Sequence, residues 1–167
     1  ANSFTQSAGS LLTQFDGVID LASNFTFTGQ ALSINGAGTN DADGSMTITN
    51  AGTFTTGNSA VLDVGTEFIQ SGLGVSVIGA NITSQADGIA FATGVTLTGT
   101  AGEVIEFKTA GDANDDIVLS STLANTNNES ITFDAGSAGD ITVTGAIGDL
   151  GTGDILIDNA DTVAFSS

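Results

Sequence analysis

The feature that most constrains the fold is a short strand pattern that the chain repeats. Residues 139–143 have the sequence GDITV, and residues 153–157 have the similar sequence GDILI. Each joins a turn-forming Gly-Asp to an alternation of apolar and polar side chains, which is typical of a β-strand with one buried face. Repetition of one short strand with the same entry predicts a fold that is itself built by repetition.

Alternating apolar segments of three to five residues continue along the whole chain, and Gly, Asn, Asp or Ser bounds nearly all of them. Short period-2 segments between turn residues indicate strands, and no segment has a convincing amphipathic helical pattern. We therefore predict an all-β protein. The expected strands include FTF at 25–27, MTI at 46–48, VLDV at 61–64, VSV at 75–77, VTL at 95–97, VIEF at 104–107, IVL at 117–119, ITF at 131–133 and VAF at 163–165.

The spacing of isoleucines in the C-terminal third gives a period. Ile117 and Ile141 are 24 residues apart, and so are Ile131 and Ile155. Strands that recur at this interval can stack on their own copies, as in a parallel β-helix. The sequence predicts one domain over residues 1–167 with roughly seven rungs of about 20–24 residues each. The alternative is a β-sandwich with strands every 8–12 residues.

Thr-x-Thr triplets give a weaker sign of the same period. They occupy residues 26–28, 47–49, 96–98 and 142–144, near multiples of about 23 residues. In a strand, the central apolar residue points inward and both threonines point outward. Stacked in phase, the triplets would form a flat threonine array of the kind that binds ice, although threonine is also an ordinary strand residue.

Composition excludes several classes of function. The chain has no Cys, His, Arg, Trp, Tyr or Pro, and its single Lys faces 19 acidic residues, for a net charge of −18. A thiol or imidazole catalyst and an ordinary zinc site are therefore excluded. A chain this acidic does not bind nucleic acid or insert into anionic membranes. We expect no enzymatic activity. The absence of Pro suits strands that must donate hydrogen bonds on both sides.

Three segments carry a resemblance to a known group of proteins: SFTQSAGSLLTQ at 3–14, AGTFTTGNSAVLDV at 51–64 and GDITVTGAIGDLGTGDILIDN at 139–159. Their texture resembles the repeat regions of bacterial filamentous-haemagglutinin-like and autotransporter passenger proteins. The resemblance implies a right-handed parallel β-helix that is secreted or held at the bacterial surface. It also implies adhesive, matrix or fibre-building work without catalysis.

Two acidic loops are candidates for metal binding. TNDADG at 39–44 and GDANDD at 111–116 each gather several carboxylate and amide oxygens, the ligands that Ca²⁺ prefers. Asp112, Asp115 and Asp116 form the better cluster. The alternative is a solvated turn, since neither loop has the spacing of an EF-hand. We expect no required cofactor, and Ca²⁺ is the one candidate ion.

The sequence therefore predicts a structural or adhesive repeat protein of the bacterial surface or extracellular matrix. Expected partners are further copies of the chain, end to end or side by side, or a glycan or protein of a host or cell surface. Exposed end rungs favour self-assembly into fibres. Repulsion between carboxylates opposes lateral packing, so divalent cations should promote it. The alternative is a module that binds Ca²⁺, glycan or ice.

Overall fold

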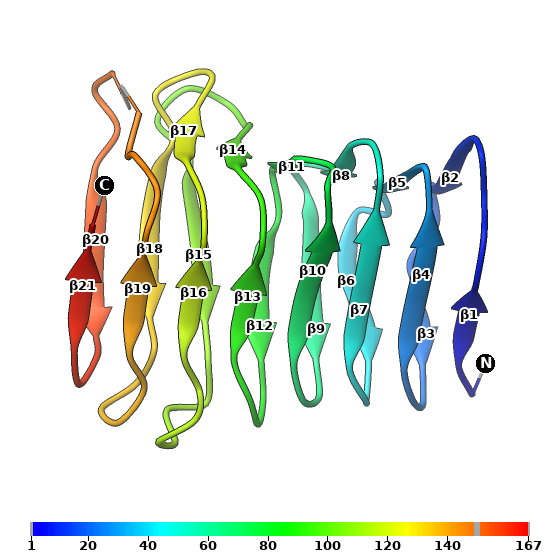
Figure 1. Cartoon of the computed structure of the whole chain (residues 1–167), viewed down its shortest axis with the longest axis horizontal. Coiled ribbons are helices and arrows are strands. Elements are labelled where there is room, and N and C mark those ends of the chain that lie inside the picture. Colours follow the sequence, from blue (N-terminus) through cyan, green and yellow to red (C-terminus); the bar gives the residue numbers. More distant parts are fainter. Residues whose placement is uncertain (1, 149–150, 167) are drawn as a thin grey trace.

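The computed structural model describes residues 2–148 and 151–166, and this part of the chain forms three parallel β-sheets (Figure 1). It contains no helix that is long and apolar enough to cross a membrane. Sheet A contains β1 (Phe4–Gln6), β4 (Phe25–Gly29), β7 (Met46–Asn50), β10 (Phe68–Gly72), β13 (Ile89–Phe91), β16 (Ile117–Leu119), β19 (Ile141–Val143) and β21 (Val163–Phe165).

The other two sheets complete each turn of the coil. Sheet B contains β2 (Leu12–Phe15), β5 (Ala31–Ile34), β8 (Phe54–Thr56), β11 (Ser76–Ile78), β14 (Val95–Leu97) and β17 (Leu123–Asn125). Sheet C contains β3 (Asp20–Leu21), β6 (Gly38–Ala42), β9 (Ala60–Val64), β12 (Asn81–Ser84), β15 (Val104–Lys108), β18 (Ser130–Asp134) and β20 (Ile155–Asn159).

The chain winds through sheets A, B and C in that order and makes about seven turns. In Figure 1 it rises through sheet A at the front, crosses sheet B at the top and descends through sheet C at the back. It advances from right to left at the same time, so the coil is right-handed. The predicted right-handed parallel β-helix is confirmed. The β-sandwich alternative is wrong, because each strand pairs in parallel with the strand one turn away.

The register explains both the success and the limit of the predicted period. Ile117 pairs with Ile141 and Ile131 with Ile155, so the 24-residue repeat is confirmed there. The earlier turns are shorter: the first positions of β1, β4 and β7 pair after 21 residues, as Phe4 with Phe25 and Phe25 with Met46. The turn that begins at Ile89 is longer and pairs with Ile117. The first turns therefore fall within the predicted range of about 20–24 residues, and the turn from Ile89 to Ile117 exceeds it.

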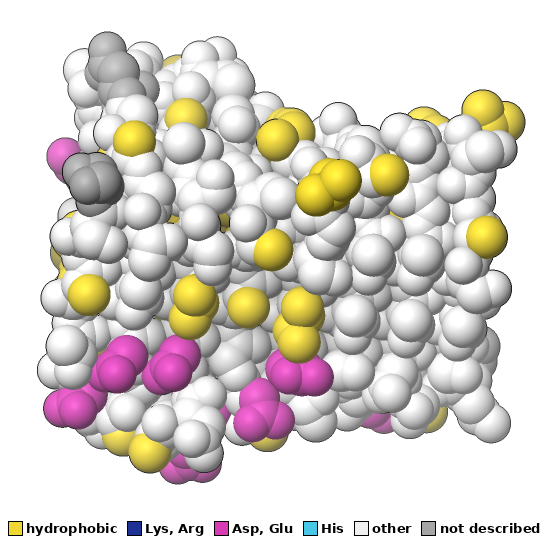
Figure 2. Space-filling view, viewed as in Figure 1, with side chains coloured by type: hydrophobic (Ala, Val, Ile, Leu, Met, Phe, Trp, Pro, Cys, Tyr) yellow, Lys and Arg dark blue, Asp and Glu magenta, His cyan; other side chains and the backbone are white. Residues whose placement is uncertain are grey.

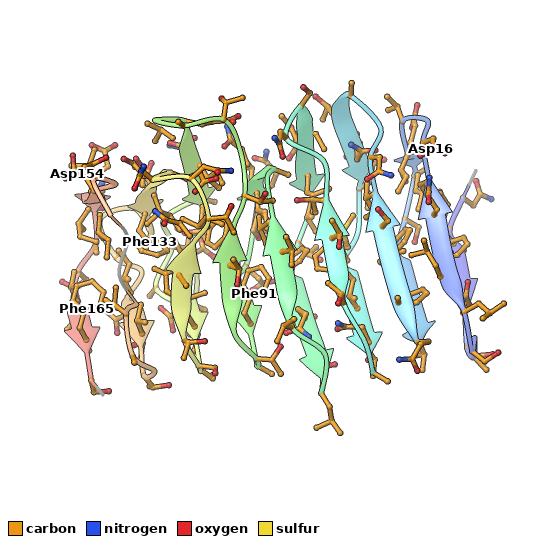
Figure 3. The ribbon with its side chains drawn as sticks, turned by 90° about the horizontal axis from the view of Figure 1, so that it is seen from above. Asp16, Phe91, Phe133, Asp154 and Phe165 are labelled. Carbon is orange, nitrogen blue, oxygen red and sulfur yellow. The ribbon has the colours of Figure 1, made fainter. Side chains whose placement is uncertain are left out.

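The interior is a continuous column of alternate strand residues. Strands such as β8, β13 and β19 place their first and third residues inside and their second residue outside. A row of phenylalanines runs through the middle of the rod, each within 6.2 Å of the next between ring centroids. Figure 3 shows Phe91 and Phe133 inside the coil, with Asp16 and Asp154 on its outer side. The row consists of Phe54, Phe68, Phe91, Phe107 and Phe133.

Some inward-facing side chains are polar, and hydrogen bonds within the core satisfy most of their donors and acceptors. Gln70 is 1% exposed and lies in register between Ile48 and Phe91. Its Nε2 donates to Oδ1 of Asn50 at 2.6 Å, and its Oε1 accepts from the Thr93 hydroxyl at 3.1 Å. Buried amides paired in this way cost little free energy. Polar residues can therefore occupy a core column without ending the coil.

Candidate interaction surfaces

Charge is divided sharply between the faces of the rod. The eight strands of sheet A and the six of sheet B contain no charged residue. In the described part of the chain, every charged side chain lies on sheet C or in a loop that enters or leaves sheet C. Figure 2, which looks onto sheet A, shows acidic side chains along the lower border of this face. We call the outer faces of sheets A and B, with the loops joining A to B, the uncharged A–B surface.

Threonines form only part of this surface. Thr26 and Thr28 of β4 lie in register with Thr47 and Thr49 of β7, with their neighbouring apolar residues inside as predicted. The next strand has Ile69 at the corresponding outer position. The triplet at 96–98 belongs to sheet B, so it is out of line with the others. The expected common phase of the four triplets is therefore wrong, and the interrupted array does not favour ice binding.

Sheet C carries a column of carboxylates. Asp20 lies in register with Asp41, and Asp41 with Asp63. Partial burial raises the pKa of Asp41, and the negative charges of Asp43, Asp63 and Asp20 raise it further. Like charges directly opposite one another on neighbouring strands destabilise a sheet. The column therefore reduces the stability of the fold near neutral pH.

Replacing Asp41 with asparagine should relieve this repulsion. Because its pKa is raised by folding, Asp41 favours the folded state below the ordinary aspartate pKa and loses that contribution as the pH rises through the raised value. We expect Asp41→Asn to increase the free energy of unfolding at pH 7 and low salt by about 0.5 kcal/mol. The gain should shrink at high salt and disappear near pH 3.

Urea unfolding followed by circular dichroism measures this effect, and Asp16→Asn is the matched control. Hydrogen bonds from Gln14 and Asn35 hold the pKa of Asp16 below its ordinary value. Neutralising Asp16 should therefore bring no gain at pH 7. An equal gain in both variants would show that total charge, rather than the column, is responsible.

The single lysine interrupts the acidic face. The Lys108 ammonium donates to the Asp134 carboxylate on the neighbouring strand β18. This hydrogen bond is the main cause that raises the pKa of Lys108, and the charges of Asp134, Glu106 and Asp158 act in the same direction against partial desolvation. The ion pair satisfies Asp134, which is almost fully buried. The only lysine of the chain therefore forms an ion pair within the rod.

The three predicted calcium ligands lie in the loop between β15 and β16. Asp115 is buried, its Oδ2 accepts from the backbone N–H of Asp112 at 2.7 Å, and its Oδ1 has no hydrogen-bond partner. Asp116 accepts from the backbone N–H of Asp140 at 2.9 Å, whereas the Asp112 side chain is exposed. No group of three or more acidic residues in the described ranges is arranged to hold a metal ion. Calcium binding at Asp112, Asp115 and Asp116 stays a prediction.

The other acidic loop, at 39–44, is part of the coil. Asn40 is fully buried, accepts from the backbone N–H of Ile19 at 3.1 Å and donates to the carbonyl of Gly36 at 2.9 Å. Asp41 belongs to the sheet C column, and Asp43 is exposed. The loop residues therefore face in different directions, and Asn40 holds two turns together.

The end turns expose strand edges and part of the core. In the described residues, β1 and β21 are the outermost strands of sheet A, and β3 and β20 are those of sheet C. Val163 is 41% and Phe165 48% exposed, although their columns are buried in the interior turns. Among the described residues, each end of the coil therefore has strand edges that no described strand covers, and the C-terminal end exposes the apolar side chains Val163 and Phe165.

Exposed leucines were not predicted as surface residues. Leu73 is 90% exposed and Leu11 is 78% exposed, both in loops joining sheet A to sheet B. In the sequence they resemble the leucines of the core, because only the path of the chain decides which leucine points outward.

Comparison with protein-family models, with curated proteins and with solved structures found no match.

Proposed function

We propose that this chain is a structural segment of a bacterial surface or extracellular fibre, and that it lengthens by end-to-end stacking of coils. The observation that carries the proposal is the open strand edge at each end of the described coil, which no other strand of residues 2–148 and 151–166 covers. Unpaired strand edges favour pairing with another chain. The first six turns indicate how a further turn is accommodated, because they repeat the same three parallel pairings.

The side chains at the two ends are compatible. If β21 of one copy pairs with β1 of the next, Val163 lies beside Phe4 and Phe165 beside Gln6. This places a glutamine against an apolar residue, as Gln70 already lies against Ile48 inside the rod. Burial of the apolar side chains stabilises such a joint by about 25 cal/mol per Å².

Charge at the joint is also acceptable on sheet C. A register shift in β20 brings Asn159, rather than Asp158, opposite Asp134. In a joint that pairs β21 with β1, β20 lies in the seventh turn and β3 of the next copy in the ninth, so Asn159 and Asp20 are two turns, about 9.6 Å, apart along the rod. Asp20 therefore meets no carboxylate of the neighbouring copy directly, unlike its contact with Asp41. A heterologous contact of this kind does not close and generates a filament.

Negative-stain microscopy of the purified protein over a range of concentrations tests the proposal. We expect filaments one coil wide whose length grows with concentration. Phe165→Asp puts a carboxylate into the inner column and should abolish them. Ala164→Asp adds the same charge to the same strand on its outer face and should leave them intact. Wild-type rods that never join, or filaments unaffected by Phe165→Asp, would contradict end-to-end stacking.

A calcium-binding module is the second candidate, favoured by the buried, unpartnered Oδ1 of Asp115. A divalent cation is one group that could satisfy this oxygen. A melting temperature that falls on chelation in the wild-type protein but not in Asp115→Asn would favour this function.

A further inference from the structure

The two most exposed apolar side chains of the described rod, Leu73 and Leu11, lie where sheet A turns into sheet B, and Leu12 and Val75 are their exposed neighbours in sequence. Leu11 and Leu12 belong to the first turn, and Leu73 and Val75 to the fourth. Their exposed fractions are 78%, 55%, 90% and 49% respectively. Leaving a leucine in water rather than buried costs about 1.5–3 kcal/mol. Two apolar ridges thus cross the corner, three turns or about 14 Å apart.

Small residues separate the ridges. A shallow groove of about 360 Å³ runs along the corner from the first turn to the fourth, lined in part by Gly9, Gly29 and Ala51 and ending at Leu73. The fourth turn needs glycine here, because Gly72 has φ +99° and a Cβ on it would lie 2.4 Å from the Asn50 carbonyl oxygen. The corner of the fifth turn is also small, with sequence ATG at 92–94. The corner therefore alternates ridge, groove, ridge and groove.

We infer that the uncharged A–B surface pairs two copies of this chain side by side, in antiparallel orientation about a two-fold axis at the third turn. That axis exchanges the fourth turn with the second and the first with the fifth. Leu73 of each copy then lies over Gly29, the exposed Gln30 and Ala31 of the other, and Leu11 over the small residues at 92–94. A two-fold interface needs a surface that is complementary to itself, and this corner meets that requirement.

The distribution of charge favours a second copy of this chain as the partner that binds the uncharged A–B surface. Two molecules of net charge −18 repel each other, and only the uncharged A–B surface can make contact without facing carboxylates. Depletion of charge from the centre with charges at the rim is the usual arrangement of a protein interface. A glycan would need other features, since the chain has neither Trp nor Tyr to stack on a sugar ring.

The available area is sufficient for a specific contact. Five turns extend about 24 Å along the axis, and one strand on each side of the corner spans about 30 Å, so the patch covers roughly 700 Å². A standard interface buries about 800 Å² on each partner. With residual repulsion between the rods, we expect a dissociation constant on the order of micromolar.

This pairing is independent of end-to-end stacking and differs from packing through sheet C. The predicted promotion by divalent cations applies where carboxylates face one another. Pairing through the A–B surface should need only monovalent salt to screen the remaining repulsion. Chelation in 0.15 M NaCl should therefore leave it unchanged.

Sedimentation equilibrium of the Phe165→Asp protein tests the inference, because this background removes stacking at the ends. We expect a monomer–dimer equilibrium. Leu73→Asp should weaken dimerisation by about 100-fold or more, since two carboxylates must enter apolar grooves. Leu156→Asp is the matched control, the same substitution at a 56% exposed position on sheet C, and should leave the dimer intact. Circular dichroism verifies that each variant is folded.

A single cysteine gives an independent measurement of the axis, because the chain has no native cysteine. Ala51→Cys, at the third turn, should form a disulfide-linked dimer on oxidation, whereas Ser120→Cys, in the sixth turn, should not. Four outcomes would overturn the inference: a monomer at all concentrations, dimers that require Ca²⁺, equal effects of Leu73→Asp and Leu156→Asp, or a monomer whose Leu73 instead binds a neutral glycan.

Discussion

Replacing Phe107 with alanine lowers the free energy of unfolding by about 3–5 kcal/mol, the range for removing a phenylalanine from a closely packed core. Phe107 is fully buried in β15. Its ring is stacked on Phe91 with centroids 5.5 Å apart and meets Phe133 edge to face at 5.9 Å. The substitution therefore removes two aromatic contacts and leaves a cavity in the middle of the row.

Urea unfolding followed by far-ultraviolet circular dichroism measures the loss, since the chain has no Trp or Tyr for fluorescence. Phe165→Ala is the control, because that side chain is 48% exposed at the end of the rod and touches no other ring of the row. Its cost should be below about 1.5 kcal/mol. Equal losses in the two variants would show that the phenylalanine row does not stabilise the centre of the coil.

The strands of the C-terminal third could be predicted because isoleucine recurs at their first inner position. Ile117, Ile131, Ile141 and Ile155 all occupy the first inner position of their strands, so the period is visible in the sequence. The pairing also answers why GDITV and GDILI are alike. They lie on different sheets, and each stacks on the strand one turn earlier.

The N-terminal rungs could not be fixed because polar residues occupy inner positions there. Asn40, Thr56, Gln70 and Ser76 are all buried, and they interrupt the apolar alternation on which the prediction depends. Loop length varies as well, since the loops before β15 and β16 lengthen the fifth turn. No local pattern states how many residues a loop will use before the chain returns to the same column.

The distribution of charge was also beyond prediction from the sequence. Acidic residues are scattered along the chain, and their separation from sheets A and B appears only when the turns are aligned. The same alignment shows that the triplet at 96–98 lies on sheet B, out of line with the triplets at 26–28 and 47–49 on sheet A. The three predicted calcium ligands are close in sequence, but Asp115 and Asp116 accept hydrogen bonds from different backbone segments.

Deleting one complete turn, Phe68–Gly88, leaves the remaining rod folded. The deletion joins Glu67 to Ile89 and brings strands together that are two turns apart in the native coil. By register, Ile48 then stacks on Phe91 and Leu62 on Phe107, so the core stays apolar. The free energy of unfolding of such a coil is approximately a sum of contributions from its turns and the interfaces between them. Removing one turn therefore lowers this free energy by one contribution and leaves the other turns folded.

Deleting only Ile78–Gly88 abolishes the cooperative transition. This half-turn contains β12, so β9 and β15 lose their common neighbour in sheet C while sheets A and B still hold the turns about 4.8 Å apart. The end of β11 would also have to join β13 directly, with no residues to cross the width of sheet C. Backbone groups of both flanking strands would be left unpaired.

Circular dichroism melting and limited proteolysis of the two deletion variants test whether a whole turn, but not half a turn, can be removed from the rod. The whole-turn variant should melt cooperatively and resist protease, and the half-turn variant should do neither. The whole-turn deletion also carries an internal check, because it places Asp63 opposite Lys108, where Thr83 lies in the native coil. Lys108→Ala should then cost the shortened rod more stability than it costs the full-length rod, since Lys108 gains a second acidic neighbour. If the whole-turn variant unfolds as completely as the half-turn variant, the turns are not interchangeable units, and a rod that lengthens by adding turns at its ends loses its physical basis.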